Sequence, residues 1–261
     1  MASGDPTTTR QLFQHDRVAA GYASARPYLH PEVFARVRDL VGPSPRFRRA
    51  LDVGCGTGLS SVALCDLADE VVGIDASLEM LRHARRADGV RFVAADAEAV
   101  PFGDGRFDLI LACGSMDWID RPRFLPRAAD LLASGGWLVS LDFGDTGRSS
   151  EVPDLSRWHD EVFRKVFPRP AAADPVIATG EALAHGFEVP AFMGLASGWT
   201  FTAPEYATFL MTESNVVAAV EYGDRTANQV RASLLRDLDP LFEGQPRRVQ
   251  FEGYIQALRR L

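Results

Sequence analysis

The chain lacks any apolar run long enough to cross a membrane. None of its stretches approaches the ~20 consecutive apolar residues that a spanning helix needs. The first fourteen residues are polar and lack the apolar centre of a secretory signal. These absences predict a cytoplasmic protein without a membrane partner.

Cysteine is also scarce. Cys55, Cys65 and Cys113 lie far apart, form no pair motif and are odd in number. This usage predicts reduced thiols in an intracellular compartment rather than a disulfide framework. No spacing of cysteine, histidine and carboxylate residues is typical of a metal site, so we expect no metal.

Lysine is scarce as well. Lys165 is the single lysine among the 28 basic residues. The formal net charge is −7, and the arginines are scattered rather than gathered in a track. Nucleic-acid binding proteins usually carry a basic face, so the sequence predicts no nucleic-acid partner.

Short apolar segments alternate with helical segments from residue 50 onward. The expected strands are 50–54, 70–75, 90–96, 107–113 and 135–143, and the expected helices between them are 59–68, 77–87 and 122–132. This alternation predicts a doubly wound, mainly parallel α/β sheet. Two later strands, near 189–201 and 248–258, would bring the sheet to seven.

Three regions follow from this pattern. Residues 1–42 form an N-terminal helical lid, with a frayed start, a helix over 11–24 and a second helix ending near Gly42. Residues 43–145 form the α/β core, entered through a short linker. Residues 146–261 hold substrate-side helices and the last two strands. Within them, residues 154–167 read as an amphipathic helix whose inward side chains are Leu155, Trp158, Val162, Phe163 and Val166.

The stretch "LDVGCGTGLS" (51–60) joins the first strand to a helix. Gly54, Gly56 and Gly58 let a ligand approach the backbone closely, and the helix start favours an anion. The spacing G-x-G-x-G is shorter than a dinucleotide fingerprint, and no Gly-Lys-Ser/Thr follows for a phosphate loop. The loop therefore suits a nucleoside without a pyrophosphate.

Acidic and small residues at the ends of the next strands support a nucleoside. Asp75 ends the second strand, 21 residues after Gly54, where a carboxylate accepts both ribose hydroxyls. Asp96 follows the third strand, where it is placed to accept the adenine amine. Cys113 and Gly114 end the fourth strand and leave room for a ligand.

These segments together resemble the class I S-adenosylmethionine-dependent methyltransferases. The similarity is carried in order by "LDVGCGTG" (51–58), "VVGIDASLEML" (71–81), "FVAADAEAVPFGDGRFDLI" (92–110) and "LLASGGWLVSLDF" (131–143). It implies a Rossmann-like methyltransferase fold and S-adenosylmethionine as cofactor. The cofactor-binding residues that it implies are Tyr22, Arg26, Asp52, Gly54, Cys55, Gly56, Asp75, Ala76, Ser77, Asp96, Ala97 and Cys113.

The chemistry implied is methyl transfer to oxygen, nitrogen or carbon of a small, apolar or aromatic molecule of specialised metabolism. Candidate proton acceptors are His15, Asp117 and His159; Asp117 stands where similar chains often carry histidine. Candidate substrate contacts are Trp118, Trp158 and Trp199. We expect a monomer or homodimer. Two alternatives remain open: a cofactor-binding protein that catalyses another reaction, such as cyclisation, and a regulatory module.

Overall fold

A computed structural model describes residues 11–42, 46–170 and 172–261. The predicted frayed start and most of the predicted linker fall outside these residues. The chain forms two compact units. The sheet unit contains Tyr28–Phe143, Ala173–Leu195 and Gly253–Leu261, and the helical unit contains Met1–Pro27, Gly144–Ala172 and Ala196–Glu252.

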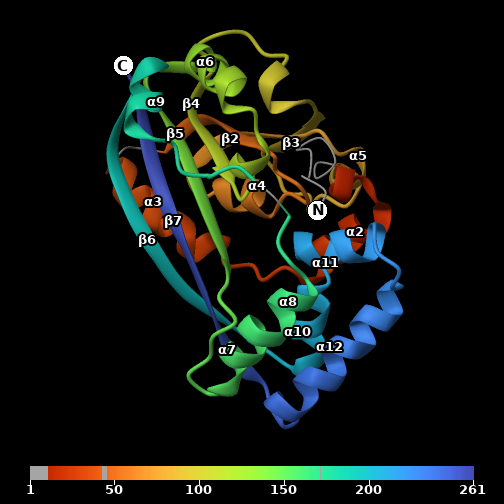
Figure 1. Cartoon of the computed structure of the whole chain (residues 1–261). Helices are drawn as coiled ribbons and strands as arrows, with labels where there is room; N and C mark the ends of the chain where they lie inside the picture. The colour runs from red at the N-terminus through yellow and green to blue at the C-terminus, as the bar shows by residue number, and fades with distance from the viewer. Residues whose placement is uncertain (1–10, 43–45, 171) are drawn as a thin grey trace. The chain divides into compact units, whose positions relative to one another are not determined.

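The sheet has seven strands in the order β3-β2-β1-β4-β5-β7-β6, drawn as arrows in Figure 1. Their bounds are β1 Phe47–Val53, β2 Ala68–Asp75, β3 Val90–Ala94, β4 Phe107–Cys113, β5 Leu132–Asp145, β6 Phe187–Phe201 and β7 Arg247–Arg260. The pairings among the first five are all parallel, and Leu51 stands opposite both Val72 and Ile110. The predicted doubly wound, mainly parallel sheet of seven strands is confirmed.

Helices cover both faces of the sheet unit, because the central strands are apolar on both sides. One face packs against α3 (His30–Val41) and α4 (Leu59–Leu64), and the other packs against α6 (Arg121–Leu131). The remaining elements of this unit are α5 (Leu78–Arg82), η2 (Ala97–Ala99), η3 (Met116–Trp118) and α9 (Thr179–Ala184). Ser77 caps α5 as its side chain accepts from the Met80 N–H, at 3.1 Å.

Two helices are shorter than predicted. The helix expected over 59–68 ends at Leu64, because the next residues form a turn that brings the chain to β2 at Ala68. The helix expected over 77–87 ends at Arg82. Both strands beyond these helices begin close to the predicted positions.

The helical unit gathers the ends of β5, β6 and β7 with short helices. These are η1 (Gln11–Gln14), α2 (Asp16–Ala25), α7 (Asp154–Trp158), α8 (Arg164–Val166), α10 (Ala203–Leu210), α11 (Ser214–Glu221) and α12 (Ala227–Phe242). Its core is an aromatic cluster in which ring centroids lie 5.4–6.3 Å apart; the rings belong to Phe201, Tyr206, Phe209, Phe242 and Phe251. No helix in the described parts of the chain has the length and apolarity to cross a membrane.

The predicted helix over 154–167 is interrupted by a π-turn, η4 (His159–Phe163), between α7 and α8. The prediction that Val162 and Val166 face inward is wrong, since their side chains are 41% and 49% exposed. The wider turn shifts the helical phase. His159 and Phe163, at the two ends of η4, are buried, and so is Phe167 at the end of the segment.

Candidate active site

The loop after β1 has the backbone that the three glycines predicted. Gly54, Gly56 and Gly58 have φ of +68°, +52° and +76°, a region that residues with side chains rarely adopt. A Cβ built on Gly54 would lie 2.6 Å from the Cβ of Ser115, so the backbone needs glycine there. A Cβ on Gly56 would meet no described atom within 4 Å. Space for a ligand therefore remains beside Gly56.

Asp75 ties this loop to the end of β2. One carboxylate oxygen accepts the Gly56 N–H at 2.8 Å, and the other accepts the Ser77 N–H at 2.8 Å. Burial raises the pKa of Asp75, while the two backbone hydrogen bonds act in the opposite direction. Each oxygen still has a lone pair for a ligand hydroxyl. The carboxylate is thus held in place before a nucleoside binds.

Asp52, at the end of β1, is fully buried and only half satisfied. Its Oδ2 accepts hydrogen bonds from Ser60 Oγ at 2.7 Å and Ser61 Oγ at 2.5 Å, whereas Oδ1 has no partner among the described residues. Burial raises the pKa of Asp52 to about 6, and the charge of Asp75 adds to the rise. The hydroxyl of Thr57 is likewise buried without a partner in the described part of the chain. A buried polar atom without a partner is costly, so both atoms suit a bound ligand.

The other predicted cofactor residues of the sheet unit follow neighbouring strands. Asp96 is exposed at the start of η2, directly after β3, and Cys113 ends β4. The carboxyl ends of parallel neighbours lie at one sheet edge. That edge brings together Asp52, Gly54, Cys55, Gly56, Asp75, Ala76, Ser77, Asp96, Ala97 and Cys113.

Tyr22 and Arg26 belong to the helical unit, where Arg26 makes several contacts. Its guanidinium pairs with Glu213 at 3.0 Å, donates to the Thr212 carbonyl at 3.0 Å and lies 4.3 Å from the centre of the Tyr22 ring. The guanidinium therefore already pairs with one carboxylate, that of Glu213. The roles of both residues toward a cofactor stay predictions.

The candidate proton acceptors fall in different units. Asp117 and Trp118 lie on η3 of the sheet unit, and both side chains are half-buried. Asp117 lies close enough to Tyr254 for its charge to contribute to the raised pKa of that phenol, about 12, which burial dominates. Tyr254, whose hydroxyl lies 3.2 Å from Ser140 Oγ and from the Pro175 carbonyl, is a polar group that sequence reasoning missed.

His15 and His159 belong to the helical unit. His15 is an exposed residue 3.6 Å from Glu221, whereas His159 is only 4% exposed. In the same unit, the Trp158 indole N–H donates to Asp237 at 3.3 Å and its ring packs against Phe163. Trp199 is 38% exposed. Asp117 and Trp118 thus belong to the sheet unit, whereas the two histidines, Trp158 and Trp199 belong to the helical unit. The functional roles of all six stay predictions.

Asp145 is the residue that sequence reasoning should have found. It ends β5 just as Asp75 ends β2, and the same strand-end argument applies to it. It is buried, accepts the Gly147 N–H at 2.7 Å and the Tyr206 hydroxyl at 2.6 Å, and burial raises its pKa to about 6. In the described ranges, no group of three His, Cys, Asp or Glu residues is arranged to hold a metal ion.

Comparison with known proteins shows which family the residues at this edge of the sheet resemble. A family described as "Methyltransferase domain" matches residues 51–140, which contain every strand-end residue from Asp52 to Cys113. The chain therefore carries a class I methyltransferase domain. The resemblance inferred from the motifs is confirmed.

Two relatives show the extent of this similarity. A malonyl-[acyl-carrier protein] O-methyltransferase from Enterobacter lignolyticus is 38% identical over 109 residues, 40% of this chain and 43% of that protein. A demethylmenaquinone methyltransferase from Renibacterium salmoninarum is 38% identical over 109 residues, 41% of this chain and 46% of that protein. This chain thus spans less than half the length of these relatives. The similarity covers the methyltransferase domain rather than the remainder.

Solved structures extend the likeness in fold to most of the chain. A protein described as a type II methyltransferase from Anaeromyxobacter dehalogenans has a TM-score of 0.69 at 22% identity, covering 88% of this chain and 95% of that one. The [4+2]-cyclase SpnF has a TM-score of 0.51 at 21% identity, covering 88% and 81%. The methyltransferase fold therefore supports more than one reaction, and the reaction has to be argued from the site.

Proposed function

We propose that this protein transfers the methyl group of S-adenosylmethionine to a small molecule. The observation that carries the proposal is Asp75, a carboxylate fixed by two backbone hydrogen bonds at the strand end that follows the glycine loop. The match of residues 51–140 to the methyltransferase domain supports the same cofactor.

The residues present suit that cofactor. Asp75 accepts hydrogen bonds from the ribose hydroxyls of the cofactor. The open space beside Gly56 admits the part of the cofactor that lies against the backbone of the loop. Asp52 Oδ1 accepts from the amino group of the cofactor, directly or through water. Asp96 and Ala97 face the adenine. When bound, S-adenosylmethionine supplies a methyl group on a sulfonium, which is a good leaving group.

The protein's own part is positioning more than chemistry. In-line displacement requires the acceptor atom to be held against the methyl carbon, with water excluded. An oxygen or nitrogen acceptor also has to lose a proton, for which the chain offers Asp117, His15 and His159. We propose Trp118, Trp158 and Trp199 as contacts to an apolar or aromatic acceptor.

The composition of the sequence also supports a proposal about the location and partners of the protein. We propose a cytoplasmic enzyme, monomeric or homodimeric, without nucleic-acid or membrane partners. The net charge of −7 supports the absence of a nucleic-acid partner, since a nucleic-acid methyltransferase has to bind phosphates.

The test is calorimetric titration with S-adenosylmethionine, followed by incubation with a panel of phenols, carboxylic acids, amines and enolisable ketones. The expected result is tight binding and release of S-adenosylhomocysteine with at least one acceptor class. Binding without turnover on the whole panel contradicts methyl transfer and favours a cyclase or a regulatory protein. Absence of binding contradicts the cofactor itself.

A further inference from the structure

A row of carboxylates lies along the carboxyl edge of the sheet unit, and it includes one that the proposed function does not use. Asp75 ends β2 and Asp52 lies at the end of β1. Asp142, on β5, follows Leu141, which pairs with Cys113 at the end of β4. The strands are neighbours in the order β2-β1-β4-β5. Because adjacent strands lie about 4.8 Å apart, the three carboxylates share one short stretch of the edge.

Asp142 lies directly against the chain where it leaves β4. Gly114 follows Cys113 with φ of +63°, and its N–H donates to the Leu141 carbonyl at 2.8 Å. A Cβ built on Gly114 would lie 3.3 Å from Oδ1 of Asp142. Since β4 lies between β1 and β5, Asp142 and Asp52 approach the end of β4 from its two sides.

Two thiols show that the charges of these carboxylates overlap. Burial raises the pKa of Cys113 well above its ordinary value, and the charges of Asp52 and Asp142 raise it further. Burial likewise raises the pKa of Cys55 in the glycine loop, where the charges of Asp52 and Asp75 add to the rise. The charges that act on these two thiols are all negative.

The same charges reach β7, the strand beyond β5. Burial raises the pKa of Tyr254 to about 12, and the charges of Asp142, Asp117 and Asp174 add to the rise. The negative region therefore extends over the ends of neighbouring strands from Asp75 on β2 to Tyr254 on β7.

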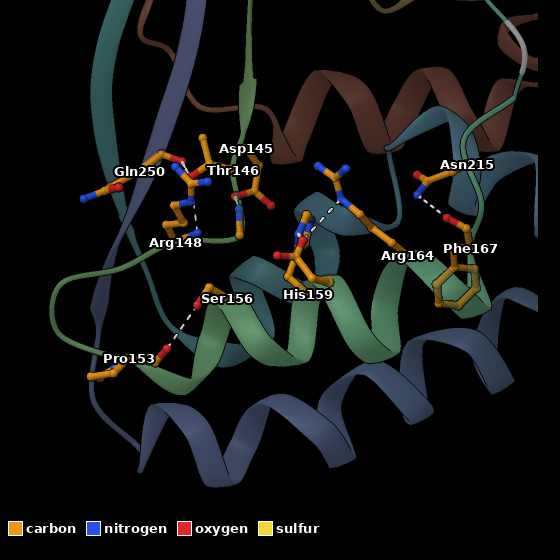
Figure 2. Close-up of polar contacts among 12 residues, drawn as sticks. Asp145, Thr146, Arg148, Pro153, Ser156, His159, Arg164, Phe167, Asn215 and Gln250 are labelled. Carbon is orange, nitrogen blue, oxygen red and sulfur yellow. Dashed lines mark hydrogen bonds and ion pairs between the residues drawn. The ribbon is translucent and has the colours of Figure 1, made fainter.

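Two other places in the chain combine carboxylates with arginine. Burial raises the pKa of Cys65, just after α4, but the charge of Arg46 lowers it. In the helical unit, Figure 2 shows Asp145 and Arg164 on either side of His159. Burial raises the pKa of Asp145 to about 6, and the charge of Arg164 acts in the opposite direction. The carboxyl edge of the sheet unit thus differs from both places in the sign of the charge around it.

Asp52 gives a separate indication that a ligand binds within this negative region. Its side chain is fully buried, and Oδ1 has no partner among the described residues. Burial raises the pKa of Asp52 only to about 6, so the carboxylate is ionised above neutral pH. A buried charge without a partner is costly, and a cation bound beside it offsets that cost.

The cofactor of the proposed function carries such a cation at its sulfur. The sulfur is bonded to the 5′ carbon of the ribose and to the amino-acid chain. It therefore lies between the parts of the cofactor that Asp75 and Asp52 bind. S-adenosylhomocysteine has the same skeleton with a neutral sulfur, so the two molecules differ by one positive charge and one methyl group.

We propose that Asp142, together with Asp52, makes this edge selective for the sulfonium of S-adenosylmethionine over the neutral thioether of S-adenosylhomocysteine. Asp142 is thereby a specificity-determining residue. The inference rests on the proposed function. When the methyl group is transferred, its bond to sulfur breaks, the electron pair of that bond stays on sulfur, and an electron pair of the acceptor forms the new bond. The positive charge at sulfur disappears, so the edge holds the product less strongly than the substrate.

Calorimetric titration of the full chain slightly above neutral pH tests the selectivity. S-adenosylmethionine should bind about tenfold more tightly than S-adenosylhomocysteine, because unit charges a few ångström apart interact strongly even at the effective dielectric constant of a protein surface. The aza analogue, with a protonatable nitrogen in place of sulfur, separates the charge from the methyl group. Its affinity should fall as the pH is raised and the nitrogen loses its proton. Equal affinities for the first two ligands, or tighter binding of S-adenosylhomocysteine, overturn the proposal.

Substitutions locate the effect. Asp142→Asn keeps the size of the side chain and should lower the ratio of the two affinities about threefold, by weakening the binding of S-adenosylmethionine alone. Asp142→Glu keeps the charge and should keep the preference. Asp69→Asn is the matched control, since Asp69 lies at the other end of β2 and is 59% exposed. An unchanged ratio in Asp142→Asn refutes the role of Asp142.

The comparison of ligands in the natural protein does not depend on how the variants fold. It also separates this inference from the proposed function. Absence of binding by all three ligands contradicts the proposed cofactor and the selectivity together. Tight and equal binding of S-adenosylmethionine and S-adenosylhomocysteine contradicts the selectivity alone.

Discussion

At the scale of single residues, the site depends on carboxylates that hydrogen bonds hold in place before a ligand binds. Asp75 and Asp52 lie at adjacent strand ends, and the charge of Asp75 contributes to the raised pKa of Asp52. Asp145 repeats this pattern in the helical unit. Buried carboxylates cost stability, so their retention at strand ends indicates use rather than support of the fold.

Asp75→Ala should weaken cofactor binding by about 2 kcal/mol or more, because each hydrogen bond to a charged group contributes roughly 1.5–3 kcal/mol. Calorimetric titration with S-adenosylhomocysteine measures this loss. Asp69→Ala is the control, since Asp69 lies at the other end of β2 and its side chain is 59% exposed. Equal affinities of the two variants would refute the role of Asp75.

Asp145→Asn should change how stability depends on pH. The pKa of Asp145 is raised from 3.8 to about 6 in the folded protein. The folded state therefore holds this proton more tightly, and the stabilisation is lost as pH rises from about 4 to about 6. The free energy of unfolding of the natural protein should fall over that range, relative to the variant, by on the order of 2 kcal/mol.

Urea unfolding of both proteins at pH 4, 5.5 and 7 provides the measurement. Asp52 titrates in both proteins and cancels from the difference. A difference that stays constant with pH would show that the pKa of Asp145 is not raised by burial.

At the scale of elements, close strand packing and an irregular helix shape the two units. A Cβ on Gly253, in β7, would lie 1.9 Å from the carbonyl oxygen of Asp142 in β5. Neither backbone can move without breaking the pairing of these strands. In the helical unit, the π-helical segment η4 shifts the phase of the helix, so that His159 is buried and Val162 is exposed.

Gly253→Ala should destabilise the protein by about 3 kcal/mol, the upper end of the usual cost of overpacking. Gly194→Ala is a matched control from the neighbouring strand β6, because its Cβ would meet only the Gly253 carbonyl, at 4.0 Å. Thermal unfolding followed by circular dichroism compares them. Similar melting temperatures would mean that β5 and β7 separate easily at this point.

At the scale of the whole molecule, the N-terminal segment is a part of the helical unit that the sequence predicts to act as a lid. Leu12 and Val18 are buried and pack with Val217, and Arg26 pairs with Glu213. The lid hypothesis requires this segment to restrain a cofactor bound in the sheet unit. The predicted division into 1–42, 43–145 and 146–261 stays a prediction.

Deletion of residues 1–27 should speed the dissociation of S-adenosylhomocysteine, measured by stopped-flow fluorescence. The deletion also removes Leu12 and Val18 from their contacts with Val217, so Arg26→Gln is the milder test. Loss of one charge-assisted contact corresponds to roughly tenfold faster release. Unchanged rates in both variants would count against a lid.

The sequence by itself determined the sheet, the glycine loop and the carboxyl-edge residues. These follow from local patterns: apolar strands alternate with helices, glycines occupy positions of positive φ, and parallel strands end at one edge. Asp75 was therefore found from its place at the end of a predicted strand, 21 residues after Gly54.

Only the tertiary structure decided that His159 is buried. Regular helical spacing placed Val162 and Val166 inside, and no local signal indicated the π-turn that buries His159 instead. The Asp145–Tyr206 hydrogen bond joins residues 61 positions apart. Contacts of that kind depend on how separate elements pack, and the energy of packing overrides the periodicity that a single helix shows in its sequence.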